Sequence, residues 1–479
     1  MNGVSATGRS AAERRLSEEV RGAVLVPGDP GFDAGCAGFQ TGYHHRPSVL
    51  VRATGPEDVV AAVTYAAAHG MPIAVQATGH GLSVPLDGGM LISTGDLTGV
   101  TVDAPARTAR IAAGTRVHAV VDAAARHGLA PLNGSSPDVS AVGYLLGGGL
   151  GLLARQFGYA ADHVRAVGIV TADGRHRHVT ADQDPDLFWA VRGAGANFGV
   201  VTSIETGLVP VSRLYGGELT FDTARTPDIL DAYLRWTGTL PEELTSSVST
   251  IGYPDVTAVP APLRGRHVAH VRVAYTGDAR TGQELLAPLR AAGPRLRDTL
   301  GEMPYTECAD IYRDPRHPHA YLGDNVLVRD LGAEAAAALA RSTGPGAPVR
   351  RVLDIRHLGG ALGRPSAVPD AVGHRTARYL VRVLTPLDGT STQEAQAAHR
   401  EVLDVLAPER LGRFHNLVYG GCADGADPDP SADFWEPADH RRLAELKARH
   451  DPGNLFRCNR NILPQRLPGA RASAGPARS

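Results

Sequence analysis

The residues best suited to chemistry are one histidine and two runs of glycine. His80 lies in the run Gln76-Ala77-Thr78-Gly79-His80-Gly81-Leu82-Ser83, and a second glycine-rich stretch covers residues 134–151. Backbone dense in glycine lets N–H groups approach an anion closely, where side chains would otherwise intervene. Two such loops, one of them carrying an imidazole, predict a site that wraps a large phosphate-bearing cofactor from two sides.

Alternating helix and strand patterns must position these loops. Thr54-Gly55-Pro56-Glu57 predicts a capping box at the start of a helix, and Gly70 is a natural stop for that helix. The short apolar run 72–76 predicts a buried strand that delivers His80 at its C-terminal end, where α/β units present ligands. A second helix, with apolar residues from 117 to 124, leads to the second glycine loop.

The later chain follows a different pattern. Residues 167–175 predict a strand that enters a tight Asp-Gly turn, with the return strand starting at Val179. From about 212 to 416, predicted strands alternate with longer helices, which is typical of an α+β domain with an antiparallel sheet. The strands are expected at 219–221, 267–274 and 379–384, the helices at 332–342 and 391–406, and a final helix at 441–449.

Composition excludes several classes of protein. The 479 residues carry a formal net charge of -2 with interspersed signs, which offers nucleic acid no basic face. Neither a signal-peptide core nor an 18-residue apolar stretch occurs, so a cytoplasmic chain without a membrane partner is expected. The only lysine, Lys447, is expected at a solvated helix position, which leaves neither a Walker loop nor a Schiff-base lysine.

Four segments together resemble the FAD-linked oxidases of the vanillyl-alcohol oxidase and p-cresol methylhydroxylase superfamily, and within it the berberine-bridge-enzyme-like group. They occur in that family's order. The segments are the Gly79-His80 loop, residues 134–151, residues 186–201 (DLFWAVRGAGANFGVV) and residues 451–462 (DPGNLFRCNRNI).

The resemblance implies an α+β fold of two parts: a two-subdomain FAD-binding domain and a substrate domain whose antiparallel sheet is covered by helices. The C-terminal segment is expected to return to the FAD domain. The expected divisions are an N-terminal segment 1–38, the FAD-binding domain 39–211, the substrate-binding domain 212–415, the C-terminal segment 416–466 and a disordered tail 467–479.

The resemblance also implies that His80 bonds covalently to the 8α-methyl group of the flavin, which would make the flavin a stronger oxidant. Some relatives add a second bond, from a cysteine to flavin C6. Ser136 stands at the matching position here and cannot form that thioether. FAD attached through His80 alone is therefore expected.

Further cofactor contacts are carried over position by position from the same resemblance. They fall in the two glycine loops, in the segment after residue 194 and in the asparagine-rich tail. The expected cofactor-binding residues are Ala77, Thr78, Gly79, His80, Gly81, Leu82, Ser83, Ser135, Ser136, Val139, Ser140, Val142, Gly143, Gly149, Gly151, Asn197, Gly199, Val201, Asn459 and Asn461. Residues 147–151 are expected to pack beneath the flavin ring.

Enzymes of this family pass hydride from a substrate C–H to flavin N5 while a tyrosine or glutamate takes a proton, and oxygen then reoxidises the flavin. Many relatives have Tyr-x-Asn where this chain has Phe414-His415-Asn416, so the usual tyrosine is replaced. On a strand, His415 and Tyr419 would share one face, opposite Phe414. The candidate catalytic residues are Tyr419, His415, Arg382 and Tyr144.

The expected activity is therefore an oxygen-using oxidation of a small molecule, a specialised metabolite or a sugar, by a monomer or homodimer. The altered residues keep open a redox-neutral cyclisation or elimination on the same flavoprotein fold. Gly149-Leu150-Gly151-Leu152-Leu153-Ala154, with Asp173 further on, also satisfies a dinucleotide fingerprint and would predict an NAD-dependent dehydrogenase.

No metal site is expected. His44-His45, His176-Arg177-His178 and His317-Pro318-His319 lack a carboxylate or cysteine at a recognised spacing and are expected at the surface. The four cysteines lie far apart and indicate neither a zinc site nor a disulfide scaffold.

Overall fold

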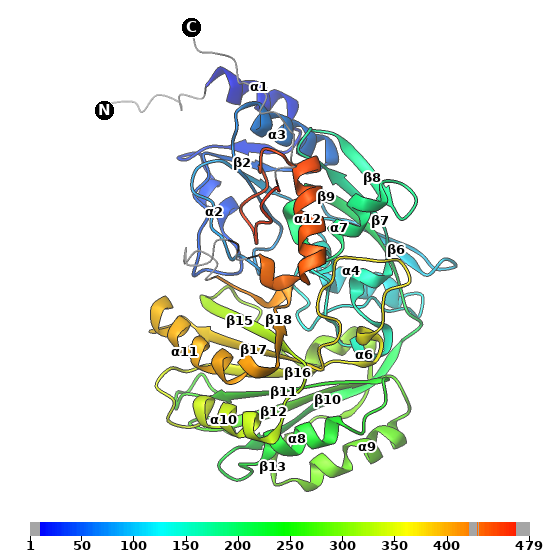
Figure 1. Ribbon diagram of the computed structural model, residues 1–479, viewed down its shortest axis with the longest axis vertical. Coiled ribbons are helices and arrows are strands. Elements are labelled where there is room, and N and C mark those ends of the chain that lie inside the picture. The colour runs from blue at the N-terminus through cyan, green and yellow to red at the C-terminus, as the bar shows by residue number, and fades with distance from the viewer. Residues whose placement is uncertain (1–9, 421–428, 430, 466–479) are drawn as a thin grey trace.

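The computed structural model describes residues 10–420, 429 and 431–465, and its chain forms three sheets that are divided between the two ends of the long axis (Figure 1). Two smaller sheets occupy one end, with helices α1 (Ala11–Glu19), α3 (Pro56–Ala68) and α12 (Pro437–His450) around them. The largest sheet occupies the other end. This division matches the expected α+β architecture with a cofactor part and a sheet-rich substrate part.

The first sheet has four strands in the order β1-β2-β4-β3, of which β2, β4 and β3 run parallel. Its strands are β1 (Ala23–Leu25), β2 (Val49–Arg52), β3 (Ile73–Gln76) and β4 (Met90–Ser93). The predicted strand 72–76 is confirmed as β3. Because β1 already belongs to this sheet, the cofactor part begins before residue 39, inside the expected N-terminal segment.

Helix α3 is confirmed, with Gly70 in the left-handed region at φ +63° just beyond its end, but its start is not a capping box. Gly55 is the N-cap and has no side chain to offer. Asp58, in the first turn, instead fixes the chain before the helix: its carboxylate accepts from the Thr54 N–H and hydroxyl, both at 2.8 Å, and from the Arg21 N–H at 2.7 Å. Burial opposes ionisation, yet these hydrogen bonds hold the pKa of Asp58 below its usual value.

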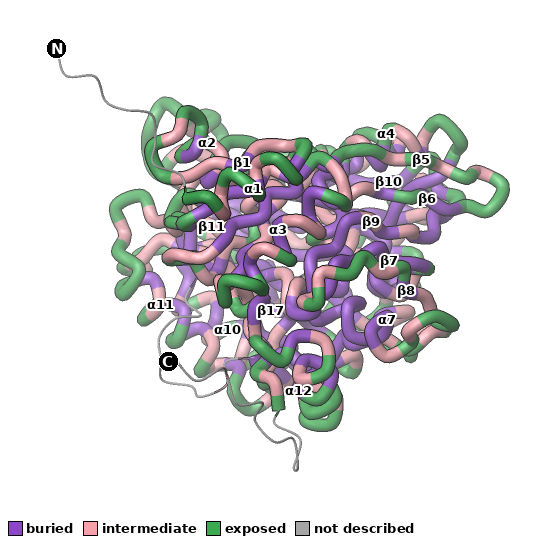
Figure 2. The backbone as a smooth tube through the Cα atoms, turned by 90° about the horizontal axis from the view of Figure 1, so that it is seen from above, coloured by how far each residue is buried: buried purple, intermediate pink, exposed green. Residues whose placement is uncertain are grey.

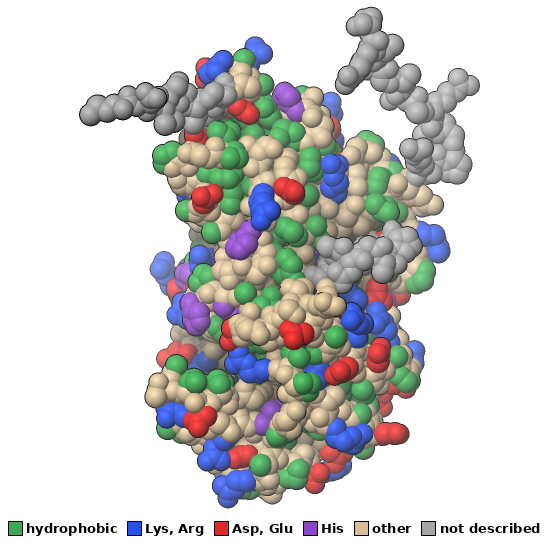
Figure 3. Space-filling view, turned by 90° about the vertical axis from the view of Figure 1, so that its left-hand side faces the viewer, with side chains coloured by type: hydrophobic (Ala, Val, Ile, Leu, Met, Phe, Trp, Pro, Cys, Tyr) green, Lys and Arg blue, Asp and Glu red, His purple; other side chains and the backbone are tan. Residues whose placement is uncertain are grey.

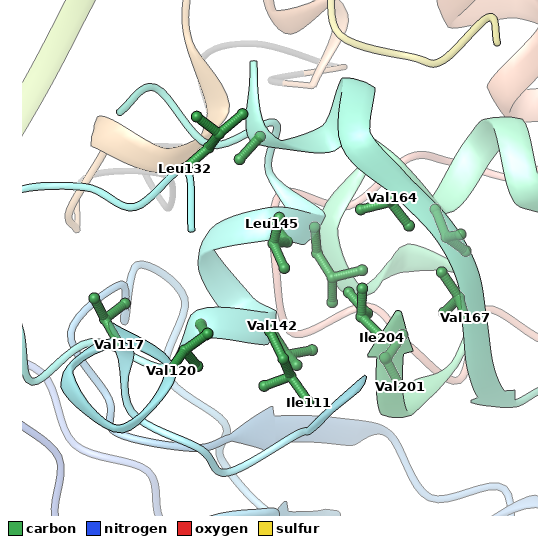
Figure 4. Close-up of a cluster of buried hydrophobic side chains, with 14 of the residues drawn as sticks. Ile111, Val117, Val120, Leu132, Val142, Leu145, Val164, Val167, Val201 and Ile204 are labelled. Atoms are coloured by element: carbon green, nitrogen blue, oxygen red, sulfur yellow. The ribbon is translucent and has the colours of Figure 1, made fainter. Parts of the chain in front are cut away.

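The second sheet is antiparallel, in the order β5-β6-β9-β7-β8. Its strands are β5 (Val100–Asp103), β6 (Thr108–Ala112), β7 (Val164–Val170), β8 (His176–Thr180) and β9 (Val200–Gly207). The predicted Asp-Gly turn between β7 and β8 and the predicted helix, α4 (Val117–Ala125), are both confirmed. Figure 4 shows side chains of helix α5 (Ala141–Leu146) packed with those of β6, β7 and β9.

The third sheet has nine strands and every pairing in it is antiparallel. Its strands are β10 (Arg213–Asp222), β11 (Leu244–Gly252), β12 (His267–Tyr275), β13 (Arg295–Asp298), β14 (Gly301–Pro304), β15 (Tyr321–Val328), β16 (Val352–His357), β17 (Tyr379–Pro386) and β18 (Arg410–Gly412). The strands and the antiparallel sheet expected between 212 and 416 are thereby confirmed.

Helices cover one face of the large sheet (Figure 1). These are α8 (Ile229–Thr237), α9 (Ala279–Ala291), α10 (Ala333–Thr343) and α11 (Thr392–Val405), of which α10 and α11 match the predicted helices. Val248, Val271, Ile355 and Val381 are completely buried in the core between sheet and helices. Because side chains alternate along a strand, their neighbours in sequence face the cofactor part of the molecule.

The final helix is confirmed as α12, which is longer than predicted and lies against α7 (Pro185–Val191). Arg442 of α12 pairs with Asp186 at 2.8 Å and lies 4.1 Å over the Trp189 ring. Lys447 is not at a solvated position: its side chain has 0% exposure. The expected disordered tail lies outside the described residues.

Short elements complete the chain: α2 (Phe32–Cys36), α6 (Ala154–Phe157) and several 3-10 turns. Strands such as β7, β9 and β17 are largely buried, while exposure concentrates in outer helices and loops (Figure 2). Positive and negative side chains are interspersed on the face drawn in Figure 3. Within the described ranges, no helix is long and apolar enough to cross a membrane.

Candidate cofactor site and substrate face

His80 follows β3 and is held by three neighbours. Its ring stacks on Phe39 with 3.8 Å between centroids, its Nδ1 lies 2.9 Å from the Thr78 hydroxyl, and its carbonyl accepts from the Tyr321 hydroxyl at 2.7 Å. Nε2 is buried without a hydrogen-bond partner. Burial, helped by the charge of Arg116, lowers the pKa of His80 to about 4, so the imidazole is neutral at pH 7.

The rest of this loop, residues 77–83, is shaped by backbone contacts. Gly79 has φ +70°, and a Cβ there would lie 2.5 Å from the Cα of Gly38, so only glycine fits. Ser83 donates to the carbonyls of Gly81 at 3.0 Å and Val418 at 3.2 Å. A Cβ on Gly81 would meet nothing within 4 Å, and Ala77 and Leu82 are half-buried. The loop therefore has an open rim beside His80.

The second loop leads into α5. Ser140 caps this helix, accepting from the Gly143 N–H at 3.2 Å and donating to the Ala113 carbonyl at 2.9 Å. Ser135 donates to the Asp314 carboxylate at 2.5 Å, which connects the loop to the substrate part. Ser136 is half-buried, and Val139 engages α4 through its carbonyl, which accepts from the Val117 N–H at 2.9 Å.

Several expected cofactor contacts are packed against protein. The side chains of Val142 and Val201 lie in the apolar cluster of Figure 4. A Cβ on Gly149 would lie 2.8 Å from the Tyr144 ring, one on Gly151 2.9 Å from its hydroxyl, and one on Gly199 2.4 Å from the Val170 carbonyl. Close packing within the protein therefore accounts for these three glycines, and only backbone atoms of the two valines could reach a ligand.

The C-terminal tail returns to this region through Asn197. The Asn197 amide donates to the Arg460 carbonyl at 3.1 Å, and its Oδ1 accepts from the Ile462 N–H at 3.0 Å. Asn459 donates to the Ala196 carbonyl at 3.2 Å. Arg460 donates to the Ser83 hydroxyl at 2.8 Å, so the tail also contacts the His80 loop.

Residues 414–416 do not lie on a strand. Residues His415–Leu417 form a 3-10 turn, so His415 and Tyr419 do not share a strand face. The cause is Asn325 of β15, which donates to the Phe414 carbonyl at 2.9 Å and accepts from its N–H at 2.8 Å, using both backbone groups. Asn416 then donates to the Tyr144 carbonyl at 2.7 Å, which ties the turn to α5.

His415 lies between the two glycine segments of the cofactor part. A Cβ on Gly195 would come 2.6 Å from its Cε1, and one on Gly147 3.0 Å from its Nδ1. Neither ring nitrogen makes a well-formed hydrogen bond. Burial, then the charge of Arg460, lower the pKa of His415 well below its usual value, and Asn416 opposes the shift only in part, so the ring is neutral.

The remaining catalytic candidates differ in their surroundings. The Tyr144 hydroxyl is buried without a partner, and burial raises its pKa strongly. The Tyr419 ring meets the Tyr321 ring edge-on at 5.2 Å, which places it near the His80 loop. Arg382 lies on the large sheet, 3.2 Å from Asp354.

Arg382 shares one face of the large sheet with other charged and polar side chains, most of which were not predicted from the sequence. They include Glu218, Arg272, Asp354, Arg356 and Tyr321. A signal was present: His270 and Arg272 in HVAHVRVAY, and Asp354 and Arg356 in VLDIRH, are polar residues two apart, as on a strand with one polar face. Which face of the sheet turns towards the cofactor part depends on the order in which the strands pair, and this order does not follow the sequence.

The structure rejects the dinucleotide interpretation of residues 149–154. The segment before Gly149 is helix α5 instead of a strand, and α6 ends before Gly158, after one turn. Asp173 is engaged by the Thr171 hydroxyl at 2.6 Å and by Arg177 at 2.8 Å.

No group of three potential metal ligands occurs among the described residues. His45 is buried instead of lying at the surface, because its Nδ1 accepts from the Leu86 N–H at 3.0 Å. Cys36, Cys308 and Cys458 are free thiols, and Cys422 is outside the described residues.

The region joining both glycine loops and the tail fits an extended polar cofactor. Buried polar atoms normally have hydrogen-bond partners, and several of the exceptions among the described residues lie in this region. Those in this region are His80 Nε2, Tyr144 Oη, both ring nitrogens of His415, Asn459 Oδ1 and Asn461 Oδ1. Together with the open rim at Gly81, they suit a ligand such as FAD that supplies the missing partners.

Two known families match parts of this chain. The FAD binding domain family matches residues 47–180, and the berberine and berberine-like family matches residues 423–463. The chain is 27% identical to (R)-6-hydroxynicotine oxidase of Paenarthrobacter nicotinovorans, over 93% of this chain and 97% of that protein.

Solved structures give the same picture. 6-Hydroxy-D-nicotine oxidase from Arthrobacter nicotinovorans superposes with a TM-score of 0.79 at 26% identity, over 93% of this chain and 98% of the other. Glucooligosaccharide oxidase from Acremonium strictum, which has a 6-S-cysteinyl, 8α-N1-histidyl FAD, superposes at 0.81 over 96% of this chain and 100% of the other. At 19% identity, the second likeness shows the fold alone.

Proposed function

The chain is an FAD-dependent oxidoreductase of the berberine-bridge-enzyme-like group in the vanillyl-alcohol oxidase and p-cresol methylhydroxylase superfamily, and we propose that it oxidises a small molecule at a carbon bearing a hydroxyl or amine. FAD bound between the glycine loops supplies the hydride acceptor, flavin N5. The relatives support this range of substrates, since one is (R)-6-hydroxynicotine oxidase and another, 25% identical over 88% of this chain, is chitooligosaccharide oxidase.

The observation that carries the proposal is the state of His80. Its imidazole is neutral, fixed by Phe39 and Thr78, and has a buried nitrogen without a partner. A neutral imidazole can act as the nucleophile in a bond to the flavin methyl group. Ser136 has no sulfur to form a second bond, so attachment through His80 alone is proposed, with molecular oxygen as the electron acceptor.

Tyr419 is the best placed of the four residues to take the substrate's proton. Its ring lies against Tyr321, whose hydroxyl donates to the His80 carbonyl, and its side chain is half-buried. The Tyr144 hydroxyl is buried and burial strongly raises its pKa, so it holds its proton, and Arg382 is paired with Asp354. His415 is enclosed by Gly147 and Gly195.

The attachment is tested by acid precipitation of the purified protein. The pellet should stay yellow for the wild type and turn colourless for His80→Ala, while the supernatant gains the released flavin. His319→Ala is the matched control, because His319 also contacts the Phe39 ring, at 5.4 Å between centroids, and should leave the pellet yellow. A yellow His80→Ala pellet would place the bond elsewhere.

The base is tested by Tyr419→Phe, which should lower kcat by roughly 10²- to 10⁴-fold, the usual contribution of a general base. Tyr65→Phe, in α3, serves as control for a tyrosine outside the site. Hydrogen peroxide formed in air, in equal amount to product, would identify oxygen as acceptor.

A redox-neutral cyclisation or elimination is the second candidate. It is favoured by Phe414, which stands where many relatives have a tyrosine. The Phe414 ring packs 5.7 Å from the Tyr159 ring, between centroids, and a phenylalanine can neither take nor donate a proton. Anaerobic mixing with substrate separates the two activities. Bleaching of the flavin band supports oxidation, whereas product formed with the band unchanged supports the redox-neutral reaction.

A further inference from the structure

Charged and polar side chains form two rows across the cofactor-facing side of the large sheet. Residues directly opposite each other on neighbouring strands share a face. The first row runs Glu218, Arg272, Ser247, Arg356 over β10, β12, β11 and β16. The second, two residues along each strand, runs Thr220, His270, Ser249, Asp354, Arg382 and reaches β17. We call these residues the polar face.

The polar face meets the cofactor site through Tyr321. Register places Asn325 of β15 opposite Arg382, and Tyr321, four residues earlier, points to the same side of the sheet. The Tyr321 hydroxyl donates to the His80 carbonyl at 2.7 Å. The valines and isoleucine between the polar positions point the other way, into the core beneath the helices. The polar face therefore forms the wall of the substrate site opposite the cofactor loops.

Positive charge is in excess on this wall. Arg356 and Arg382 share the Asp354 carboxylate, at 3.0 and 3.2 Å. Arg272 and Arg297, both at 3.9 Å, and Arg313 share Glu218. Five guanidinium groups thus face two carboxylates. Asp314, which accepts from the Ser135 hydroxyl and whose charge acts on Arg356, adds a third carboxylate and leaves positive charge in excess.

Donor groups also remain unused. The Arg382 Nε is buried without a hydrogen-bond partner, and the Arg272 Nε, also buried, has only the Glu218 carboxylate at 3.9 Å, beyond hydrogen-bond distance. The two side chains are 17% and 13% exposed. A buried donor left unsatisfied costs stability unless a ligand completes it. The Arg272 and Arg356 guanidiniums lie 4.9 and 5.5 Å from the Tyr312 ring, and Tyr312 is fixed by Ser247 at 2.8 Å. The arginines are therefore held in place before any ligand arrives.

We propose that the polar face binds a carboxylate of the substrate, so that this oxidase acts on an anionic molecule and not on a neutral sugar or a cationic alkaloid. Guanidinium groups are planar donors that match the two oxygens of a carboxylate. The proposal rests on the function proposed above, because it assigns the substrate class of that same site.

The experiment uses the purified flavin-loaded enzyme with two probes of equal shape, benzoate and neutral benzamide. Binding is measured by calorimetry and by the shift of the flavin absorption band. Benzoate should bind at least about tenfold more tightly than benzamide, since a hydrogen bond to a charged group is worth roughly one to two factors of ten. Equal affinities for the two probes, or no binding of benzoate, would overturn the proposal.

Variants locate the binding. Arg382→Gln and Arg272→Gln should each weaken benzoate binding by about tenfold or more while leaving benzamide unchanged. Arg350→Gln is the control, because Arg350 is an arginine of the same part that pairs with Asp388 at 2.6 Å, outside the polar face. Arg382→Lys retains the charge opposite Asp354 and should retain the preference for benzoate. If Arg350→Gln weakened benzoate binding as much as Arg382→Gln and Arg272→Gln do, the assignment would be overturned.

Failure of the anionic substrate class and failure of the oxidase function give different results. If the enzyme retains flavin and oxidises only neutral compounds, the substrate class is wrong and the oxidase remains. If the preparation holds no flavin, the oxidase proposal fails, while calorimetry with benzoate still tests the polar face.

Discussion

The ammonium group of Lys447 donates a hydrogen bond of 2.7 Å to the backbone carbonyl of Asn197, 250 residues away in sequence. Its other contacts are the Asp451 carboxylate at 2.7 Å and the Phe456 carbonyl at 3.1 Å. Asp451 also accepts from the N–H groups of Leu455 and Phe456. One buried ion pair thus joins α12, the tail and the segment that carries Asn197.

Replacing Lys447 with methionine should destabilise the protein by about 3–5 kcal/mol, because Asp451 would remain charged and buried without its partner. Urea denaturation measures the change. Arg441→Met, at an exposed position of the same helix, is the control and should stay within about 0.5 kcal/mol of wild type. A Lys447→Met variant as stable as the control would show that the pair contributes nothing.

Burial of the only lysine makes amine chemistry a reporter of folding. An amine-reactive acylating reagent should modify the native protein only at its N-terminal amine, and should modify Lys447 as well in urea, since the folded side chain has 0% exposure. Mass spectrometry counts the added groups. Labelling of Lys447 under native conditions at the rate found in urea would contradict the buried position.

His399 should make stability depend on pH. Burial, then the charge of Arg351, lower its pKa from 6.5 to about 4, so below pH 6.5 the unfolded chain binds a proton that the folded chain refuses. Its contribution is present above pH 6.5 and is lost as pH falls from 6.5 to about 4, on the order of 3 kcal/mol in all.

His399→Gln should therefore flatten the fall of the unfolding free energy across that pH window, measured by denaturation at each pH. The exposed His127→Gln is its control and should keep the wild-type slope. The slope is compared instead of the absolute stability, because the variant also loses the 3.0 Å contact with the Thr385 hydroxyl. An unchanged slope for His399→Gln would contradict the lowered pKa.

Gly147→Ala should lower flavin content. An added Cβ would lie 1.7 Å from Asn416 Oδ1, so the 414–416 turn or α5 must move. The ratio of flavin to protein absorbance measures the effect, and refolding with added FAD shows whether the site recovers. Gly332→Ala, where a Cβ meets nothing within 4 Å, should keep full occupancy. Equal flavin content in the two variants would show that the turn adapts without cost.

Cysteine at position 136 should form the thioether that serine cannot. In the His80→Ala background, Ser136→Cys should restore yellow colour to the acid-precipitated pellet, because a thiol near flavin C6 can bond there once oxygen removes the electrons released. Mass spectrometry of the flavin peptide locates the bond. A pellet that stays colourless would mean that residue 136 lies away from the ring edge.

Local pattern was enough to predict most elements, and it failed where distant residues decide. The 72–76 strand and the helix before it follow from apolar spacing and from Gly70. The contacts at the start of that helix could not be predicted, because Asp58 draws its partners partly from Arg21 in another segment. The turn at 415–417 could not be predicted either, because it depends on Asn325, 89 residues before Phe414, which takes both backbone groups of Phe414.

The resemblance named the residues of the glycine loops position by position, but it could not predict how those residues pack. Glycines at 149, 151 and 199 predict that another group lies close to the backbone at these positions. The structure shows that the close groups are protein atoms, those of Tyr144 and the Val170 carbonyl. The sequence therefore predicts where side chains would not fit, but only the tertiary structure shows which neighbours exclude them.

Taken alone, the sequence determined the family, the FAD-dependent chemistry and the α+β architecture, because glycine loops and strand periodicity are local properties that the order of residues carries directly. Only the tertiary structure decided that Lys447 is buried and that arginines from separate strands meet on one wall. Those outcomes depend on which strands pair and which face is covered, and burial and charge pairing are set by neighbours far away in the chain.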